Sequence, residues 1–83
     1  MEFHLELEQI LLSILKGLCD YPKEVTIDVK KEGENSIFGM ISCKKEDLSK
    51  VIGRNGRNID AVRTLAHAMC TKNGLKSNIL IRE

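Results

Sequence analysis

Apolar side chains near the start of the chain recur at the spacing of an α-helix. One stripe, with intervals of mostly three and four residues over residues 3–18, consists of Phe3, Leu7, Ile10, Leu11, Ile14, Leu15 and Leu18. Leu5 and Leu12 fall outside this stripe, so they indicate either a broader core face or a second apolar surface used for self-association. Pro22 closes the segment, because the residue before a proline avoids the helical conformation. The pattern predicts a first helix over residues 3–18.

Three later segments have the patterns of strands. Residues 24–31 alternate between branched apolar and polar side chains, which predicts a strand with one face in water. A polar turn around Gly33 then leads into residues 36–43, which are apolar on both faces, as in a central strand. Residues 76–82 alternate again and predict the last strand.

Two further helices flank a turn that contains two glycines. A short helix follows Lys44 and ends at Gly53, and the turn runs on to Gly56. A longer helix is predicted over residues 57–72. Its apolar stripe consists of Ile59, Val62, Leu65, Ala66 and Met69. The pair that begins at Asn73 and continues with a glycine then stops this helix.

The predicted elements occur in the order α-β-β-α-α-β, within one domain that spans residues 1–83. Three helices with one apolar stripe each must cover their stripes, and one face of a three-stranded sheet provides enough apolar surface for that. The sequence therefore predicts an α+β fold, a two-layer sandwich with all three helices on one face of the sheet.

Charge is unevenly distributed along the chain, although the net charge is only +1. Residues 1–35 carry four basic against eight acidic side chains, whereas residues 44–76 carry eight basic against three acidic ones. The glycine turn lies in the positive segment. A local basic face of this kind is typical of a nucleic-acid-binding surface.

Other features of the composition limit the class of protein. No apolar run approaches the roughly 18 residues that a membrane span requires, and the acidic start lacks the basic region of a signal peptide, so we expect no membrane association and a cytoplasmic location. The widely spaced Cys19, Cys43 and Cys70 form no metal-binding or disulfide pattern, and we interpret them as small apolar residues.

The glycine turn differs from the common phosphate-binding and DNA-binding motifs. It lacks the spacing of a nucleoside-triphosphate loop and of a dinucleotide site, and both of those motifs follow a strand, whereas a helix precedes this turn. A DNA-reading helix-turn-helix is the second alternative. It is disfavoured because Asp60 interrupts the exposed face of residues 57–72, which before Lys72 carries basic side chains only at Arg57 and Arg63.

The stretch Val51–Ile59 resembles the signature of the KH domain, in which an apolar pair precedes a GxxG turn and an apolar residue follows it. The order of elements is similar to that of the type II, prokaryotic KH domain, which implies a mixed sheet with residues 36–43 in the middle. In size the chain resembles the small bacterial single-KH RNA-binding proteins of the KhpA family. The resemblance implies binding of single-stranded RNA, with the GxxG turn clamping the backbone of about four nucleotides.

The residues that match the KH signature have chemistry suited to this role. The nucleic-acid-binding residues that the resemblance implies are Lys50, Ile52, Gly53, Arg54, Asn55, Gly56, Arg57, Asn58 and Ile59. The two glycines permit a close approach of the nucleic-acid backbone. The basic and amide side chains supply donors and charge, and the helix that begins after the turn offers free N–H groups to a phosphate. The two isoleucines, with residues 36–43, are expected to form an apolar floor for the bases.

The sequence shows no nucleophile, metal cluster or acid–base constellation, so we expect neither an enzyme nor a cofactor. We interpret Glu46, Asp47 and Asp60 as helix-capping or surface acids. The family resemblance implies RNA chaperoning and post-transcriptional regulation, a role in cell elongation and cell-wall growth, a homodimer, and a larger KH-containing partner protein. One alternative is a dimerisation or protein-interaction module with weak or lost RNA binding. Another is binding of single-stranded DNA, because no residue visibly reads a 2′-hydroxyl.

Overall fold

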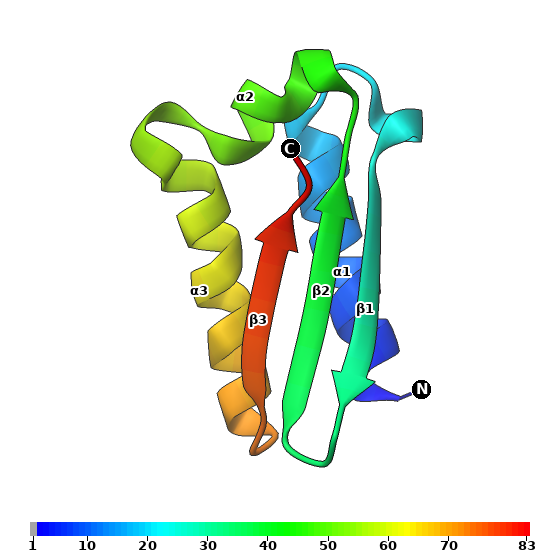
Figure 1. The fold of residues 1–83 in the computed structure, drawn as a ribbon, viewed down its shortest axis with the longest axis vertical. Helices are drawn as coiled ribbons and strands as arrows, with labels where there is room; N and C mark the ends of the chain where they lie inside the picture. Colours follow the sequence, from blue (N-terminus) through cyan, green and yellow to red (C-terminus); the bar gives the residue numbers. More distant parts are fainter. Residues whose placement is uncertain (1) are drawn as a thin grey trace.

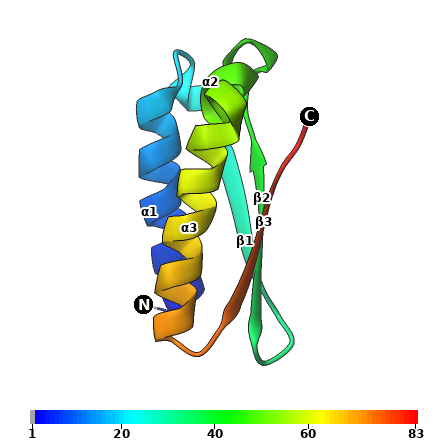
Figure 2. The same ribbon diagram turned by 90° about the vertical axis from the view of Figure 1, so that its left-hand side faces the viewer.

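The structure, a computed structural model, describes residues 2–83 and contains two layers, one of helices and one of strands (Figures 1 and 2). Within the described residues the elements are α1 (Phe3–Leu18), β1 (Thr26–Glu32), β2 (Ser36–Ser42), α2 (Leu48–Ile52), α3 (Arg57–Lys72) and β3 (Lys76–Ile81). Short 3₁₀ turns at Pro22–Glu24, Lys45–Asp47 and Arg54–Gly56 connect them. The predicted α+β class and the order α-β-β-α-α-β are confirmed.

The sheet is mixed, with β2 in its centre. β1 pairs with β2 antiparallel, and β3 pairs with β2 parallel. The predicted central position of residues 36–43 and the predicted mixed sheet are therefore confirmed. Gly39 of β2 lies opposite Val29 and Ile79, and a Cβ atom at Gly39 would come within 2.8 Å of the Ile79 side chain. The absence of a side chain at Gly39 therefore lets Ile79 of β3 pack across the centre of the sheet.

The core lies between the inner face of the sheet and the three helices (Figure 2). Its buried apolar side chains are Leu7, Leu11, Leu15, Val25, Ile27, Val29, Ile37, Ile41, Val51, Ile59, Val62, Ala66, Cys70 and Ile79. Burial of a side chain the size of leucine stabilises a fold by roughly 1.5–3 kcal/mol. Because every helix contributes to this one cluster, the helical layer holds the ends of α2 and α3 in a fixed place beside the sheet.

Two predictions within the helical stripes were wrong. Ile10 and Leu65 were assigned to buried stripes, but their side chains are 43% and 49% exposed. The buried line of α1 advances in steps of four residues, and Ile10 lies about 100° around the helix from its neighbour in that line. In α3 the buried side chains are those of Ile59, Val62, Ala66 and Cys70, and Leu65 lies beside this line. Cys70 is a core residue that the apolar stripe did not predict.

Two further features bear on the sequence-based expectations. Leu12 is half-buried against the core, whereas Leu5 is exposed, so only part of the second apolar set belongs to a broader core face. No helix among residues 2–83 is long and apolar enough to cross a membrane.

Candidate nucleic-acid interface

The GxxG turn joins α2 to α3 at one end of the helical layer, where it projects beyond the sheet (Figure 1). Three of its four residues have positive φ: Gly53 at 79°, Asn55 at 56° and Gly56 at 76°. The Gly53 N–H donates to the Ser49 carbonyl over 2.8 Å, and the Gly56 N–H donates to the Gly53 carbonyl over 3.1 Å. The chain thus reverses sharply, and Arg54 and Asn55 are exposed at the tip.

The two glycines are required for different reasons. At Gly53, a Cβ atom would lie 2.8 Å from the backbone nitrogen of Asn58, so a side chain there would collide with the start of α3. Its ψ of 170° with positive φ is also a conformation that only glycine adopts readily. At Gly56, a Cβ atom would lie 3.8 Å from its nearest neighbour, so only the left-handed backbone favours glycine. Gly53 therefore packs the turn against α3, and Gly56 shapes it.

Arg54, Asn55 and Arg57 present their side chains to solvent around this turn. Asn55 takes the left-handed conformation, which asparagine tolerates better than most residues with a Cβ. Within residues 2–83, no carboxylate lies at ion-pair distance from Arg54 or Arg57. The turn therefore carries two guanidinium groups and one amide that are free to contact an anion.

Main-chain N–H groups add to this positive surface. α3 begins at Arg57, and no side chain caps its N-terminus, so the N–H groups of its first turn lack a side-chain acceptor. Asp60 lies in this first turn with a well-exposed carboxylate. The Asp60 carboxylate lies 3.9 Å from the Arg63 guanidinium group.

The two predicted floor residues are placed differently. Ile59 is buried in the core, whereas Ile52 is half-buried and leaves part of its side chain at the surface beside the turn. Ile52 is thus accessible to a ligand, whereas Ile59 packs in the core and anchors the start of α3.

β3, and not the predicted segment of residues 36–43, is the strand that lies along α3. An open hollow of about 270 Å³ lies where they meet and is lined by Arg63, His67, Ser77, Asn78, Ile79 and Leu80. The Arg63 Nε donates to the Ile79 carbonyl over 2.9 Å, so α3 reaches the outer edge of the sheet. Sequence reasoning missed this surface. The predicted central position of residues 36–43 already implied that another strand forms each edge of the sheet. That signal could have identified an edge strand as the neighbour of α3.

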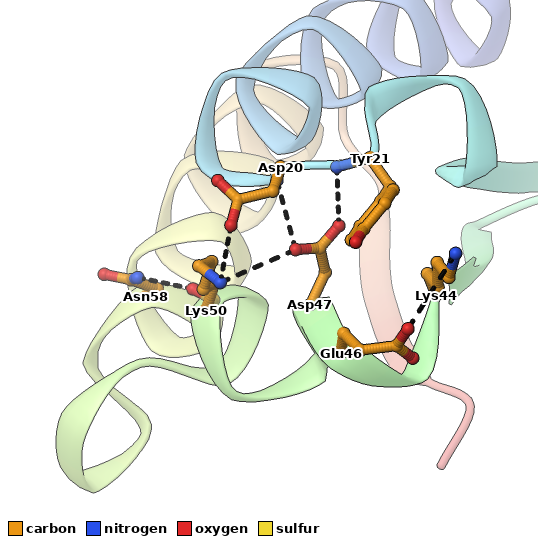
Figure 3. Close-up of polar contacts among 7 residues, drawn as sticks. All are labelled: Asp20, Tyr21, Lys44, Glu46, Asp47, Lys50 and Asn58. Atoms are coloured by element: carbon orange, nitrogen blue, oxygen red, sulfur yellow. Dashed lines mark hydrogen bonds and ion pairs between the residues drawn. The ribbon is translucent and has the colours of Figure 1, made fainter.

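Lys50 and Asn58, both predicted to bind nucleic acid, make contacts within the protein (Figure 3). The Lys50 ammonium lies 2.9 Å from the Asp20 carboxylate and 3.8 Å from that of Asp47. The hydrogen bond to Asp20 and the charge of that carboxylate raise the pKa of Lys50. The Asn58 amide donates to the backbone carbonyl of Lys50 over 2.7 Å.

Asp47 is a buried carboxylate and neither a capping nor a surface acid, which corrects the prediction made for it. Its side chain is 0% exposed and accepts hydrogen bonds from the backbone N–H groups of Asp20, at 3.1 Å, and Tyr21, at 2.9 Å (Figure 3). Burial acts to raise the pKa of Asp47, but these two donors and the nearby Lys50 and Lys44 ammonium groups outweigh burial and lower it. Asp47 therefore stays ionised inside the protein. Its contact partners lie 26 and 27 residues away, which no local pattern encodes.

The three cysteines provide no reactive thiolate. Cys70 is buried and Cys19 and Cys43 are half-buried. Burial raises the pKa of all three thiols, so each remains protonated at neutral pH. Within residues 2–83, no group of three or more His, Cys, Asp or Glu side chains is arranged to hold a metal ion.

Comparison with known proteins gives results that agree with this geometry. Residues 8–81 match the family described as KhpA/KhpB, KH domain. The RNA-binding protein KhpA of Listeria monocytogenes is 40% identical over 77 residues, which cover 93% of this chain and 100% of that protein. The RNA-binding protein KhpA of Chlamydia pneumoniae is 35% identical over 77 residues, covering 93% of this chain and 97% of that protein.

A solved structure shares the fold. The crystal structure of Era from Aquifex aeolicus superimposes with a TM-score of 0.66 over 99% of this chain, which corresponds to 32% of the Era chain. Sequence identity is 14%, so the likeness concerns the fold alone.

Proposed function

Because the chain belongs to the KhpA/KhpB family of KH domains, we propose that it is a non-enzymatic RNA-binding protein whose GxxG turn clamps a short single-stranded segment. The relatives named RNA-binding proteins match nearly the whole chain, including the turn. The observation that carries the proposal is the turn itself, a sharp left-handed reversal beside Arg54 and Arg57, whose exposed guanidinium groups lie at ion-pair distance from no carboxylate of residues 2–83.

Phosphate contacts supply most of the attraction in this proposal. Arg54 is a central residue of the turn and Arg57 directly follows it at the start of α3. Both side chains are exposed, and each guanidinium group can donate to a phosphate through two N–H groups. Asn55 at the tip adds an amide donor to the same surface.

The bases are proposed to lie between the turn and the edge of β3. The exposed part of Ile52 provides an apolar contact beside the turn. We propose that the bases also reach the hollow along α3, whose walls carry the polar side chains of Arg63, His67 and Asn78. These three residues extend the predicted set of contacts. No Phe, Tyr or Trp side chain lines the hollow, so we expect stacking to contribute little and binding to be weak and salt-sensitive, with loose sequence preference.

The cellular role follows from the family resemblance. We propose that the protein is a cytoplasmic RNA chaperone and post-transcriptional regulator that influences cell elongation and cell-wall growth. A homodimer, or a complex with a larger KH-containing protein, is part of this proposal.

A second candidate function is a protein-interaction module in which RNA binding is secondary. The exposed apolar side chains of Ile10 and Leu65 favour it. They belong to α1 and α3, which lie side by side in the helical layer and could both contact a partner protein (Figure 2). Sedimentation analysis of the protein and of an Ile10→Asp/Leu65→Asp variant tests this candidate. A strictly monomeric protein at tens of micromolar would rule out a homodimer.

The clamp is tested by replacing Arg54 and Asn55 with aspartate. Fluorescence anisotropy with a short labelled single-stranded RNA should show that affinity falls by at least about tenfold, because two donors become two repelling charges. Lys30→Asp is the control, because Lys30 is an exposed basic residue on β1, the edge strand farthest from α3. Unchanged affinity in the double variant would disprove the clamp. The same oligonucleotide as DNA separates RNA binding from general single-strand binding.

A further inference from the structure

We propose that Asp47, Lys50 and Asn58 are positioning residues, which hold the GxxG turn in its binding shape from inside the protein, and that Lys50 contacts no phosphate. The inference rests on the proposed RNA clamp and assigns how that clamp is held. It replaces the sequence-based assignment of Lys50 and Asn58 as direct contacts.

The helix that carries the turn needs outside support. α2 has five residues, which is too short for a helix to be stable by its own hydrogen bonds. Val51 is fully buried and provides one apolar anchor. Ile52, next to it, is half-buried against the same core. The remaining contacts that orient α2 are polar and involve Asp47, Lys50 and Asn58.

Asp47 fixes the start of α2 to the chain segment that follows α1. Each of its carboxylate oxygens accepts one backbone N–H, Oδ1 from Asp20 and Oδ2 from Tyr21 (Figure 3). The carboxylate is fully buried, and a buried charge is tolerated only with such partners. Loss of either donor would leave one buried carboxylate oxygen without its backbone hydrogen bond, which is costly.

Lys50 connects the middle of α2 to the same segment. Its ammonium group bridges the Asp20 carboxylate, at 2.9 Å, and the Asp47 carboxylate, at 3.8 Å. Two carboxylates and one ammonium sum to a charge of −1, so this cluster repels a phosphate. The Lys50 side chain therefore contributes to the arrangement of helices and not to the attraction of RNA.

Asn58 connects the end of α2 to the start of α3. Its amide holds the Lys50 carbonyl, and its backbone packs against Gly53 so closely that no side chain fits between them. Lys50 is thus held through its side chain from the α1 side and through its main chain from α3. The Lys50 main chain and Asn58 are the two ends of the segment that contains the GxxG turn, so their hydrogen bond fixes the distance between these ends.

This arrangement predicts two separate signatures in RNA binding. A residue that contacts phosphate changes both the affinity and its salt dependence, because each contact releases counterions. Loss of a positioning residue lowers the affinity alone. The turn is then disordered in the free protein, and ordering it during binding costs free energy. The salt dependence thus distinguishes Lys50 from Arg54, although both carry one positive charge.

The test compares Lys50→Met with Arg54→Met, using anisotropy of a short labelled single-stranded RNA between about 50 and 200 mM salt. For Arg54→Met, the slope of log affinity against log salt should become less negative by about 0.7. For Lys50→Met, affinity should fall several-fold with the slope unchanged. A slope change in Lys50→Met equal to that of Arg54→Met would overturn the proposal, and so would wild-type affinity.

Asp20→Asn provides an independent arm, because Asp20 is exposed at the surface and its replacement leaves the buried Asp47 bonds in place. If Lys50 contacts phosphate, removal of the Asp20 charge frees its ammonium and strengthens RNA binding. If Lys50 is a positioning residue, the same change weakens binding. Tighter binding by Asp20→Asn would therefore contradict the inference.

Amide hydrogen exchange of the free protein separates this inference from the RNA-binding proposal. The Gly53 N–H donates to the Ser49 carbonyl of α2 and the Gly56 N–H donates to the Gly53 carbonyl, so both report on the order of the turn. Exchange at both should accelerate several-fold in Asp20→Asn and Lys50→Met but not in Arg54→Met. Failure of the wild-type protein to bind RNA would remove only the proposed function. Unchanged exchange in both Asp20→Asn and Lys50→Met would refute the positioning role.

Discussion

Asn58 at the start of α3 donates its side-chain amide to the backbone carbonyl of Lys50 in α2, over a distance of 2.7 Å. The two residues are eight positions apart, and the whole GxxG turn lies between them. The hydrogen bond therefore closes the base of a loop whose tip carries the free arginines. The asparagine at this position thus has a structural contact within the protein.

Replacement of Asn58 by alanine should destabilise the protein by about 1 kcal/mol, the usual contribution of one hydrogen bond that is partly open to solvent. Urea denaturation followed by circular dichroism measures this loss. Gln9→Ala, which removes an exposed amide from α1, is the control and should change stability by less than about 0.5 kcal/mol. Equal stability of the two variants would show that the Asn58 contact is not formed in solution.

The two glycines of the turn should differ in their tolerance of alanine. Gly56→Ala should cost about 1 kcal/mol for the left-handed backbone. Gly53→Ala should cost more than about 2 kcal/mol, because the new Cβ also collides with the backbone of Asn58. Gly56→Asn should be nearly neutral, since asparagine adopts this conformation at position 55. Thermal unfolding of the three variants tests this order, and a greater loss in Gly56→Ala would contradict it.

Asp47 should make stability depend on pH in the acidic range. Its pKa in the folded protein is below the ordinary value, because the opposing effect of burial is outweighed by two backbone N–H donors and by lysine charges. The stabilisation is therefore complete above the unfolded-state pKa, about pH 4, and is lost as the pH falls through the lower folded-state value.

Urea midpoints measured between about pH 2 and pH 7 test this dependence. Asp47→Asn should lower stability at neutral pH, because one oxygen acceptor is lost, and should flatten the decline below about pH 4. A variant that declines as steeply as the wild-type protein would show that other carboxylates cause the acid sensitivity.

Cys70 should react with thiol reagents far more slowly than Cys19 or Cys43 in the native protein. Burial raises the pKa of its thiol, partly offset by a hydrogen bond from Ser77, and the side chain is enclosed in the core. Mass spectrometry after timed exposure to iodoacetamide measures the rates, and unfolding in urea should make the three thiols react alike. Rapid native labelling of Cys70 would indicate that α3 opens readily.

The elements of this fold could be predicted because their patterns are local. Residues 36–43 are apolar on both faces, and the structure indeed places β2 between two strands. The stripes were less accurate at Ile10 and Leu65, because helical spacing defines a broad face and only packing decides which edge of it is covered. The glycine spacing likewise predicted a tight turn, but not that Gly53 and Gly56 serve different purposes.

The support of the turn could not be predicted, since it depends on contacts between distant segments. The link from Asp47 to Asp20 and Tyr21 spans 26 and 27 residues and involves backbone N–H groups, which leave no mark in the sequence. The pairing of Lys50 with Asp20 was hidden for the same reason. A basic residue beside a GxxG turn therefore looks like a phosphate contact until its partners are located.

The salt dependence of RNA binding by the wild-type protein is the most direct test of the central claim. If the turn clamps the RNA backbone through about three phosphates, the slope of log affinity against log salt should be near −2, at ~0.7 per phosphate for single strands. Anisotropy titrations with a short labelled single-stranded RNA at several salt concentrations give this slope. A slope near zero would contradict the account, because binding would then not depend on the phosphate backbone.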